Sequence, residues 1–145
     1  MNKENKKRFQ DLYLKTKLIS HPSFIGRENC IPPANIKEAG ANDLTRLVID
    51  FIIFNDGQAE RISSMGRYID GTKQVTDCIG RKRTIGTGKY VKSTTTNGTA
   101  DISATIKGRS VKIEIKWKKD TQSKDQKAYE ASINKAGGIY IIVKT

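Results

Sequence analysis

Apolar and polar residues alternate in two runs within the last third of the chain, and four residues separate the runs. The apolar positions are Ile102, Ala104 and Ile106 in the first run and Val111, Ile113, Ile115 and Trp117 in the second. Alternation with a period of two predicts two half-buried β-strands. We expect a two-residue hairpin loop at Gly108 and Arg109, because a Gly–X pair between two such runs is typical of a tight turn.

The predicted loop determines which residues pair across the hairpin. All of the apolar residues then share one face, in the pairs Ile106–Val111, Ala104–Ile113 and Ile102–Ile115. The other face gathers Asp101, Glu114 and Lys116, with Asp101 opposite Lys116 and Ser103 opposite Glu114. A slip of one residue would separate the apolar partners, so the pattern specifies the faces strongly. The sequence therefore predicts two carboxylates and one ammonium group on one patch of a sheet.

A helical pattern precedes this hairpin. The apolar residues that follow the i, i+3, i+4, i+7, i+8 spacing of a buried helix face are Leu44, Leu47, Val48, Phe51 and Ile52. We expect this helix to begin near Leu44, with Asn42 or Asp43 as its N-cap, and to end near Asn55. After it, residues 58–69 are predicted to form a strand with a bulge at Gly66, followed by a turn at residues 70–71.

A second helix and a last strand follow the hairpin. Ser123 and Gln126 have the spacing of a capping box, which predicts a helix from about Lys124 to Ala136, with Gly137 after its end. Residues 138–143 are continuously apolar, as in a strand buried on both faces. We expect this strand to run parallel to the strand of Glu114, connected to it by a right-handed crossover.

The remaining segments frame this pattern. Residues 2–20 show roughly helical apolar spacing, which indicates a helix packed on the domain or an arm that touches DNA. Residues 21–40 contain prolines and glycines at a density that predicts an irregular connection. Residues 70–97 are rich in Gly, Thr and Lys, and we expect an extended loop or a short extra hairpin there, near the mouth of the site.

Charge and composition restrict the functional class. The 145 residues carry 27 Lys and Arg against 15 Asp and Glu, which gives a formal net charge of +12. Such an excess favours a polyanionic partner, above all nucleic acid. The single histidine, His21, and the absence of a Cys-x-x-Cys pair argue against zinc. The two cysteines and the lack of a long apolar run indicate a reduced, cytoplasmic setting and no membrane segment.

The predicted patch has a definite chemistry. Two carboxylates with a backbone carbonyl nearby suit a hard divalent cation such as Mg²⁺ or Mn²⁺. Such a metal lowers the pKa of a bound water and stabilises charge on a phosphate. The neighbouring lysine would orient that water or help to deprotonate it, and would offset charge in the transition state. On the Asp-x12-Glu-x-Lys spacing alone, the alternative of ordinary charged residues on a solvated strand face stays open.

Four blocks in order resemble one family. The Asp-x12-Glu-x-Lys spacing of Asp101, Glu114 and Lys116 on the predicted hairpin resembles the PD-(D/E)XK nuclease superfamily. Within it, residues 98–102 (GTADI) and 113–116 (IEIK) resemble blocks of the VRR-NUC (virus-type replication-repair nuclease) domain. Gln126 and residues 136–140 (AGGIY) resemble its two downstream blocks. Ala100 stands where many relatives have proline, at a position that supplies no ligand.

The resemblance implies a fold and a site. It implies an α/β restriction-endonuclease-like core, αβββαβ, with a mixed sheet flanked by helices over residues 42–145, and a helical and irregular N-terminal extension over residues 1–41. Asp101 and Glu114 would hold Mg²⁺ or Mn²⁺ with the Ile115 carbonyl. Lys116 and Gln126 would complete the catalytic set. Asp43 is a further candidate ligand, although capping its own helix is the alternative role.

The resemblance also implies partners. We expect a metal-dependent endonuclease of phage or mobile-element type, selective for branched DNA such as a Holliday junction, and a homodimer in the cytoplasm of a bacterial host. The residues we expect to contact DNA are Arg61, Arg67, Arg81, Lys82, Arg83, Lys118 and Lys119. For Arg61, Arg67 and residues 81–83, ordinary surface charge is an equally consistent alternative. The alternative functions are a non-catalytic nucleic-acid-binding module and a structural part of a phage or replication assembly.

Overall fold

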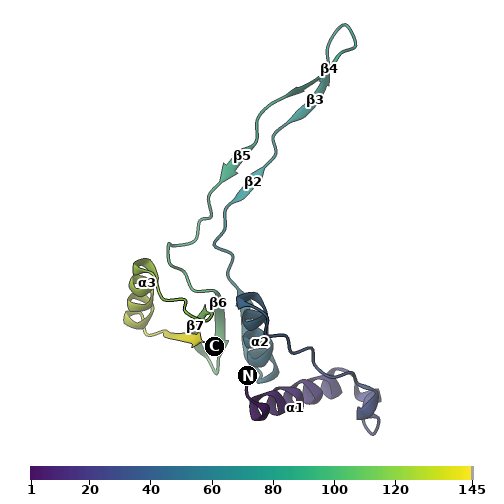
Figure 1. The fold of residues 1–145 in the computed structure, drawn as a ribbon, viewed down its shortest axis with the longest axis vertical. Coiled ribbons are helices and arrows are strands. Elements are labelled where there is room, and N and C mark those ends of the chain that lie inside the picture. Colours follow the sequence, from purple (N-terminus) through teal and green to yellow (C-terminus); the bar gives the residue numbers. More distant parts are fainter. Residues whose placement is uncertain (145) are drawn as a thin grey trace. The chain divides into compact units, whose positions relative to one another are not determined.

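The computed structural model describes residues 1–144 and divides the chain into two units (Figure 1). The first, the core unit, consists of Met1–Ile62 together with residues 97–144. The second, the arm, is Ser63–Thr96.

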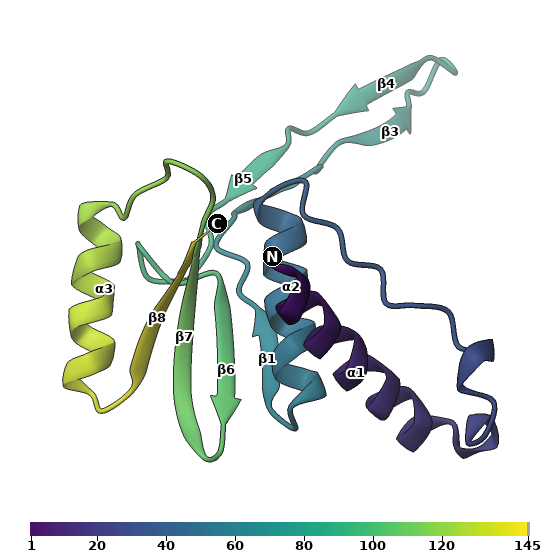
Figure 2. The same ribbon diagram turned by 60° about the horizontal axis from the view of Figure 1, so that its bottom comes forward.

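The core unit is built on a mixed sheet of four strands (Figure 2). Its strands are β1 (Gln58–Arg61), β6 (Ile102–Ile106), β7 (Arg109–Lys116) and β8 (Ile139–Lys144), in the spatial order β1-β6-β7-β8. The first three pair antiparallel as a meander, and β8 pairs parallel to β7. The α/β class, the meander and the parallel last strand are therefore confirmed.

The hairpin between β6 and β7 has a different register from the one predicted. Its two turn residues are Lys107 and Gly108, with φ of 48° and 77°, and Ile102 pairs with Ile113 rather than Ile115. Positive φ at both central residues is the signature of a type I′ turn, whose twist matches that of the strands. The register differs from the prediction by two residues, and because side chains alternate, both registers put the same residues on the same faces.

The helix α2 (Ala41–Phe54) packs on the apolar face of the sheet, and the two together form the hydrophobic core. The buried core residues are Ile52, Ile102, Ala104, Val111, Ile113 and Ile115. The helix starts earlier than predicted, because Gly40 is its N-cap and Asp43 lies in its first turn. The Asp43 carboxylate accepts a hydrogen bond from the Ala39 backbone N–H at 3.1 Å, and so closes the first turn from inside the helix. The predicted end at Asn55 is confirmed.

The helix α3 (Lys124–Lys135) begins with the predicted capping box of Ser123 and Gln126. Gly137 follows its C-cap with φ of 81°, as expected. The strand after it, β8, is not buried on both faces as predicted, since Ile141 is 41% exposed. It lies at the edge of the sheet, next to β7 only, so one of its sides has no neighbouring strand among the described residues.

The N-terminal segment belongs to the core unit. Its helix α1 (Lys3–Ser20) packs against α2, where the Phe9 and Phe54 rings meet edge to face at 5.4 Å. The predicted helix is confirmed in its packed form. The irregular connection after it contains two short 3₁₀ turns, η1 (Pro22–Phe24) and η2 (Glu28–Cys30).

The arm replaces the long strand predicted for residues 58–69. β1 ends at Arg61, and β2 (Arg67–Ile69) pairs with β5 (Lys89–Val91), not with the sheet. Beyond them β3 (Lys73–Thr76) pairs with β4 (Lys82–Ile85). The chain therefore continues through residues 70–71, and the turn predicted there is wrong. Of the two forms predicted for residues 70–97, an extended loop or an extra hairpin, the hairpin is confirmed.

Candidate active site

Glu114 and Lys116 lie near the end of β7 and face away from the α2 side of the sheet. They alternate with Ile113 and Ile115, which belong to the core on the opposite face. Both charged residues are buried, with only 2% of Glu114 and 4% of Lys116 exposed. A glutamate and a lysine are almost never buried this deeply unless they are paired. The Lys116 Nζ lies 3.0 Å from the Glu114 Oε1, so they pair with each other.

Asp101 enters the site just before β6. Its Oδ2 accepts a hydrogen bond from the Ile115 backbone N–H at 2.8 Å, and its carbonyl accepts one from the Ile62 N–H at 2.8 Å. These two bonds hold the carboxylate beside the strand of Glu114. In the shifted register Asp101 comes level with Glu114, and not with Lys116 as predicted. The three charged residues still share one patch, as the sequence predicted.

Gly98 explains how the loop before Asp101 reaches the site. Its φ is 74°, and a Cβ placed on it would lie 2.6 Å from the Gln126 backbone nitrogen. The loop therefore passes against the backbone of the first turn of α3, at a distance that only glycine allows. This close approach brings Asp101 and Gln126 to the same place from two distant parts of the chain.

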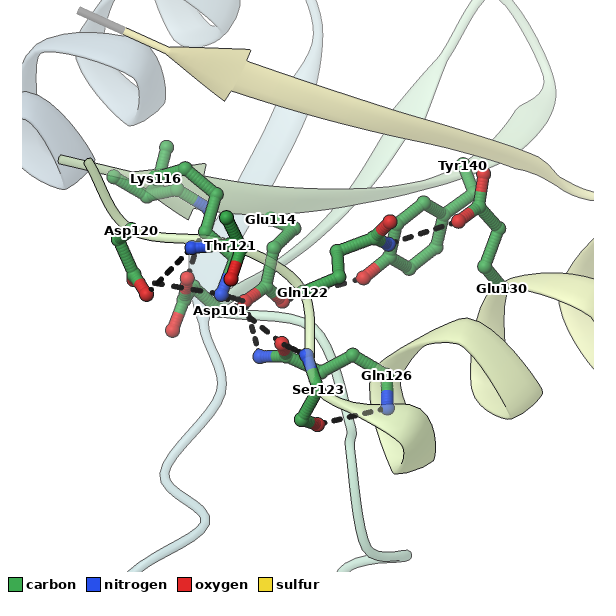
Figure 3. A network of polar contacts seen from close by, with 11 residues as sticks. Asp101, Glu114, Lys116, Asp120, Thr121, Gln122, Ser123, Gln126, Glu130 and Tyr140 are labelled. Carbon is green, nitrogen blue, oxygen red and sulfur yellow. Dashed lines mark hydrogen bonds and ion pairs between the residues drawn. The ribbon is translucent and has the colours of Figure 1, made fainter. Parts of the chain in front are cut away.

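Gln126 joins the helix cap to the charged pair (Figure 3). Its Oε1 accepts from the Ser123 backbone N–H at 2.9 Å and from the Lys116 Nζ at 3.0 Å. Its Nε2 donates to the Glu114 carboxylate. The two roles considered for this glutamine, closing the capping box and facing the site, are thus performed by one side chain.

Two further residues complete the network, and the sequence did not assign a role to either. The Tyr140 hydroxyl donates to the Glu114 Oε2 at 3.3 Å, and the Asp120 Oδ2 lies 3.4 Å from the Lys116 Nζ. Tyr140 reaches Glu114 because β8 runs parallel to β7, with Tyr140 level with Lys112. Asp120 could have been identified from the sequence, because it lies four residues past Lys116 and just beyond the end of β7.

Burial controls the protonation of the network. Burial, helped by the nearby charge of Asp101, raises the pKa of the Glu114 carboxyl, although the hydrogen bond from Lys116 opposes this shift. Burial lowers the pKa of Lys116, but its hydrogen bond to Glu114 and the charges of Glu114 and Asp120 outweigh burial and leave it raised. Lys116 is therefore a cation at neutral pH. Burial and the charge of Glu114 also raise the pKa of Tyr140, which stays a hydrogen-bond donor.

The donor set fits a hard divalent cation. Two carboxylates close enough to raise the pKa of one of them, with the Ile115 backbone between Glu114 and Lys116, match the oxygen ligands that Mg²⁺ and Mn²⁺ prefer. Within residues 1–144 no three His, Cys, Asp or Glu side chains come together as a metal-binding group. Asp43 is therefore not grouped with Asp101 and Glu114, and its carboxylate is used in the first turn of α2.

The predicted DNA-contacting residues are exposed and fall in three places. Arg61 ends β1 and donates to the Asn42 Oδ1 at 2.8 Å. Lys118 and Lys119 follow β7, and the Lys118 Nζ lies 5.9 Å from the centre of the Trp117 ring. The others, Arg67, Arg81, Lys82 and Arg83, lie in the arm.

Comparisons with protein-family models, curated proteins and solved structures found no match to this chain. Among the described residues, no helix has the length and apolar character needed to span a membrane.

Proposed function

We propose that the protein is a metal-dependent nuclease that hydrolyses DNA phosphodiester bonds. The observation that carries the proposal is the buried pair of Glu114 and Lys116 with the Asp101 carboxylate beside it. Burying a charged pair stabilises a fold little or not at all compared with apolar residues of the same size. Its presence at the end of β7, with a second carboxylate, is explained by chemistry at that place.

Asp101 and Glu114, with the Ile115 carbonyl, would hold Mg²⁺ or Mn²⁺. When bound, the metal supplies an acidified water and positive charge next to the scissile phosphate. The two carboxylates contribute negative charge at fixed positions, because Asp101 is tied to the Ile115 N–H and Glu114 to Tyr140 and Gln126. Ligands fixed in this way by a surrounding shell hold a metal more tightly than mobile ones.

Lys116 would act as a cation. Its raised pKa keeps the ammonium protonated at neutral pH, so that it donates hydrogen bonds to the attacking water or to a phosphate oxygen. Of the three roles that the sequence suggested for Lys116, orientation of the water and charge compensation are favoured over deprotonation of the water. Gln126 is a positioning residue, because it contacts both Lys116 and Glu114.

The substrate and partners follow from charge and from the family resemblance. The net charge of +12 favours DNA over an uncharged substrate. The VRR-NUC resemblance adds four properties to the proposal. They are selectivity for branched DNA such as a Holliday junction, a restriction-endonuclease-like core, a phage or mobile-element origin, and action in the bacterial cytoplasm. A homodimer belongs to the same proposal. It is supported by the uncovered edge of β8 and by an apolar cleft of about 660 Å³ lined by α1, α2 and the sheet.

A second candidate function is a non-catalytic nucleic-acid-binding module. The favouring observation is that Lys116, Gln126 and Tyr140 already satisfy the Glu114 carboxylate within the protein. Such a network folds without a metal. The module would bind DNA as the nuclease does, but it would never cut it.

Cleavage of labelled four-way junction, flap, duplex and single-stranded DNA, with Mg²⁺, Mn²⁺ or EDTA, tests the proposal. Lys116→Met removes the buried cation, and Lys112→Met is the matched control on the same strand, where the lysine instead donates to the Ser103 hydroxyl at 2.6 Å. We expect metal-dependent cleavage by the wild type and by Lys112→Met, and a loss of about 100-fold or more in Lys116→Met, since removing one charge-stabilising donor has effects of this size. DNA binding without cleavage of any of the four substrates would instead favour the binding module.

A further inference from the structure

The arm is one continuous two-stranded ribbon. Its two ladders share a register, because the three residues between β2 and β3 (70–72) face an equal number between β4 and β5 (86–88). Gly71 and Gly86 let the two backbones approach at this interruption, where a Cβ on Gly71 would lie 2.7 Å from the Thr87 carbonyl oxygen. The ribbon ends in a turn around Cys78, which is exposed.

The ribbon has no core of its own. Every residue of β2, β3, β4 and β5 is exposed. Among them are large apolar side chains, such as Tyr68 at 66% and Tyr90 at 61% exposed. An isolated two-stranded hairpin is marginally stable in water at best. The ribbon therefore leaves an exposed surface with apolar side chains that a partner can cover.

The charge of the ribbon identifies the chemistry of that partner. The arm contains seven cations and two acids, Asp70 and Asp77, so that its net charge is +5. The cations are Arg67, Lys73, Arg81, Lys82, Arg83, Lys89 and Lys92. These 34 residues thus carry five of the twelve net charges of the 145-residue chain, more than twice the density of the remainder. A polyanion is the partner that such a surface fits.

The two faces of the outer ladder differ in kind. Cross-strand pairing places Gln74 opposite Thr84 and Thr76 opposite Lys82, so that one face consists of hydrogen-bonding side chains only. The other face pairs a cation with an aliphatic residue each time, Lys73 with Ile85 and Arg83 with Val75. Lysine, glutamine and threonine side chains can form hydrogen bonds to the edges of DNA bases. The first face is therefore suited to contact bases.

Two aromatic rings pack across the inner ladder. Tyr68 and Tyr90 are cross-strand partners, and each ring crosses to a glycine of the opposite strand. A Cβ on Gly66 would lie 2.6 Å from the Tyr90 hydroxyl, and one on Gly88 would overlap the Tyr68 ring. Aromatic rings laid over glycines in this manner stabilise an exposed ladder.

We infer that the arm enters the major groove of double-stranded DNA, with Gln74, Thr76, Lys82 and Thr84 toward the base edges and the remaining cations toward the flanking phosphates. The major groove of B-DNA admits a two-stranded β-ribbon. The corresponding groove of double-stranded RNA is too narrow and deep for side chains to read. The inference takes its polyanionic partner from the proposed function and adds the segment that binds it and the form of DNA that is bound.

The two cysteines provide a test that needs no cleavage. Cys78 lies at the tip of the arm and Cys30 in η2 of the core unit, and both are exposed. The wild-type chain is alkylated with iodoacetamide in EDTA, with or without a saturating 30-base-pair DNA duplex, the RNA duplex of the same sequence or the single strand. Mass spectrometry follows each thiol. We expect the DNA duplex to slow alkylation of Cys78 by about tenfold or more and to leave Cys30 unchanged. Equal protection by RNA duplex or single strand, or no protection of Cys78, would overturn the inference.

Charge variants give an independent readout in the full chain. Lys73, Lys89 and Lys92 are replaced together by Gln in the arm, and Lys3, Lys7 and Lys15 of α1 are replaced by Gln in a control that loses the same charge. The dissociation constant for the DNA duplex is measured against salt in EDTA. We expect the logarithmic slope to fall by about 0.9 for each phosphate that the arm variant no longer neutralises, and to stay unchanged in the control. Equal slopes in both variants would count against the arm.

Neither test involves a metal or DNA cleavage, so the two proposals can fail separately. If DNA protects Cys78 but the protein cuts no DNA, the proposed nuclease activity is wrong and the arm remains the DNA-binding segment.

Discussion

At the scale of single residues, the site depends on one glutamine with two functions. Gln126 closes the cap of α3 through the Ser123 N–H and also contacts Lys116 and Glu114. These functions separate by mutation, because the Ser123 side chain takes part only in the cap, where its hydroxyl accepts from the Gln126 N–H.

We predict that Ser123→Ala lowers the free energy of unfolding by about 0.5–2 kcal/mol, the usual effect of losing an N-cap, and leaves DNA cleavage unchanged. Gln126→Ala should have a similar effect on stability but reduce the cleavage rate by about 10–100-fold, as for other residues that orient metal ligands. Denaturant unfolding and single-turnover cleavage measure the two effects. Equal cleavage rates in both variants would show that Gln126 serves only the helix.

Glu114 should make stability depend on pH in a characteristic direction. Burial raises the pKa of its carboxyl in the folded protein above the ordinary value of 4.5. The stability that this carboxyl contributes is therefore fully present below the pKa of the unfolded chain, and it is lost as pH rises through the folded pKa. Glu114→Gln removes the titration. In EDTA, we predict that the wild type loses stability relative to Glu114→Gln as pH rises above about 4.5, the ordinary pKa of a glutamate. If the difference between their free energies of unfolding, measured with urea, stays constant as pH rises, the raised pKa of Glu114 is refuted.

At the scale of elements, the site is assembled by the approach of the loop before β6 to the first turn of α3. Gly98 makes that approach, with a positive φ and no space for a Cβ. Gly137 shares the positive φ but has nothing within 4 Å of a Cβ, so it is a matched control.

We predict that Gly137→Ala costs about 1 kcal/mol from backbone strain alone, and that Gly98→Ala costs more because the Asp125–Gln126 backbone must also move. Since that movement displaces Asp101 and Gln126, Gly98→Ala should also lose cleavage activity, while Gly137→Ala keeps it. Thermal unfolding and cleavage assays compare the two. Equal effects on both readouts would show that the approach of this loop to α3 does not organise the site.

The same elements show what a sequence can and cannot predict. The faces of β6 and β7 were predictable, because alternation alone assigns Asp101, Glu114 and Lys116 to one side. Their register was not, because a shift of two residues leaves that assignment unchanged. Position within the sheet is a long-range property, which is why β8 was expected to be buried and is an edge strand. Tyr140 was missed for a related reason, since it meets Glu114, 26 residues away in the sequence, only through the parallel pairing of their strands.

At the scale of the whole molecule, chemistry and charge are divided between two units. The core unit holds the buried pair of Glu114 and Lys116 with the half-buried Asp101 beside it, and the arm carries the densest positive charge. Residues 63–96 were difficult to predict as a separate unit, because their short strands have neither a buried face nor a strong periodic signal. Taken together, the two proposals assign duplex binding to the arm and cleavage to the core unit.

The most direct test of this account is metal-dependent cleavage by Asp101→Asn. This change keeps the size of the side chain and an oxygen that accepts from the Ile115 N–H, and it removes the charge that a metal requires. Asp11→Asn, on the exposed face of α1, is the control for the loss of one negative charge. With Mn²⁺ and the wild type's preferred DNA substrate, we predict a loss of about 100-fold or more for Asp101→Asn, unchanged DNA binding, and full activity for Asp11→Asn. Cleavage by Asp101→Asn at the wild-type rate would contradict the account.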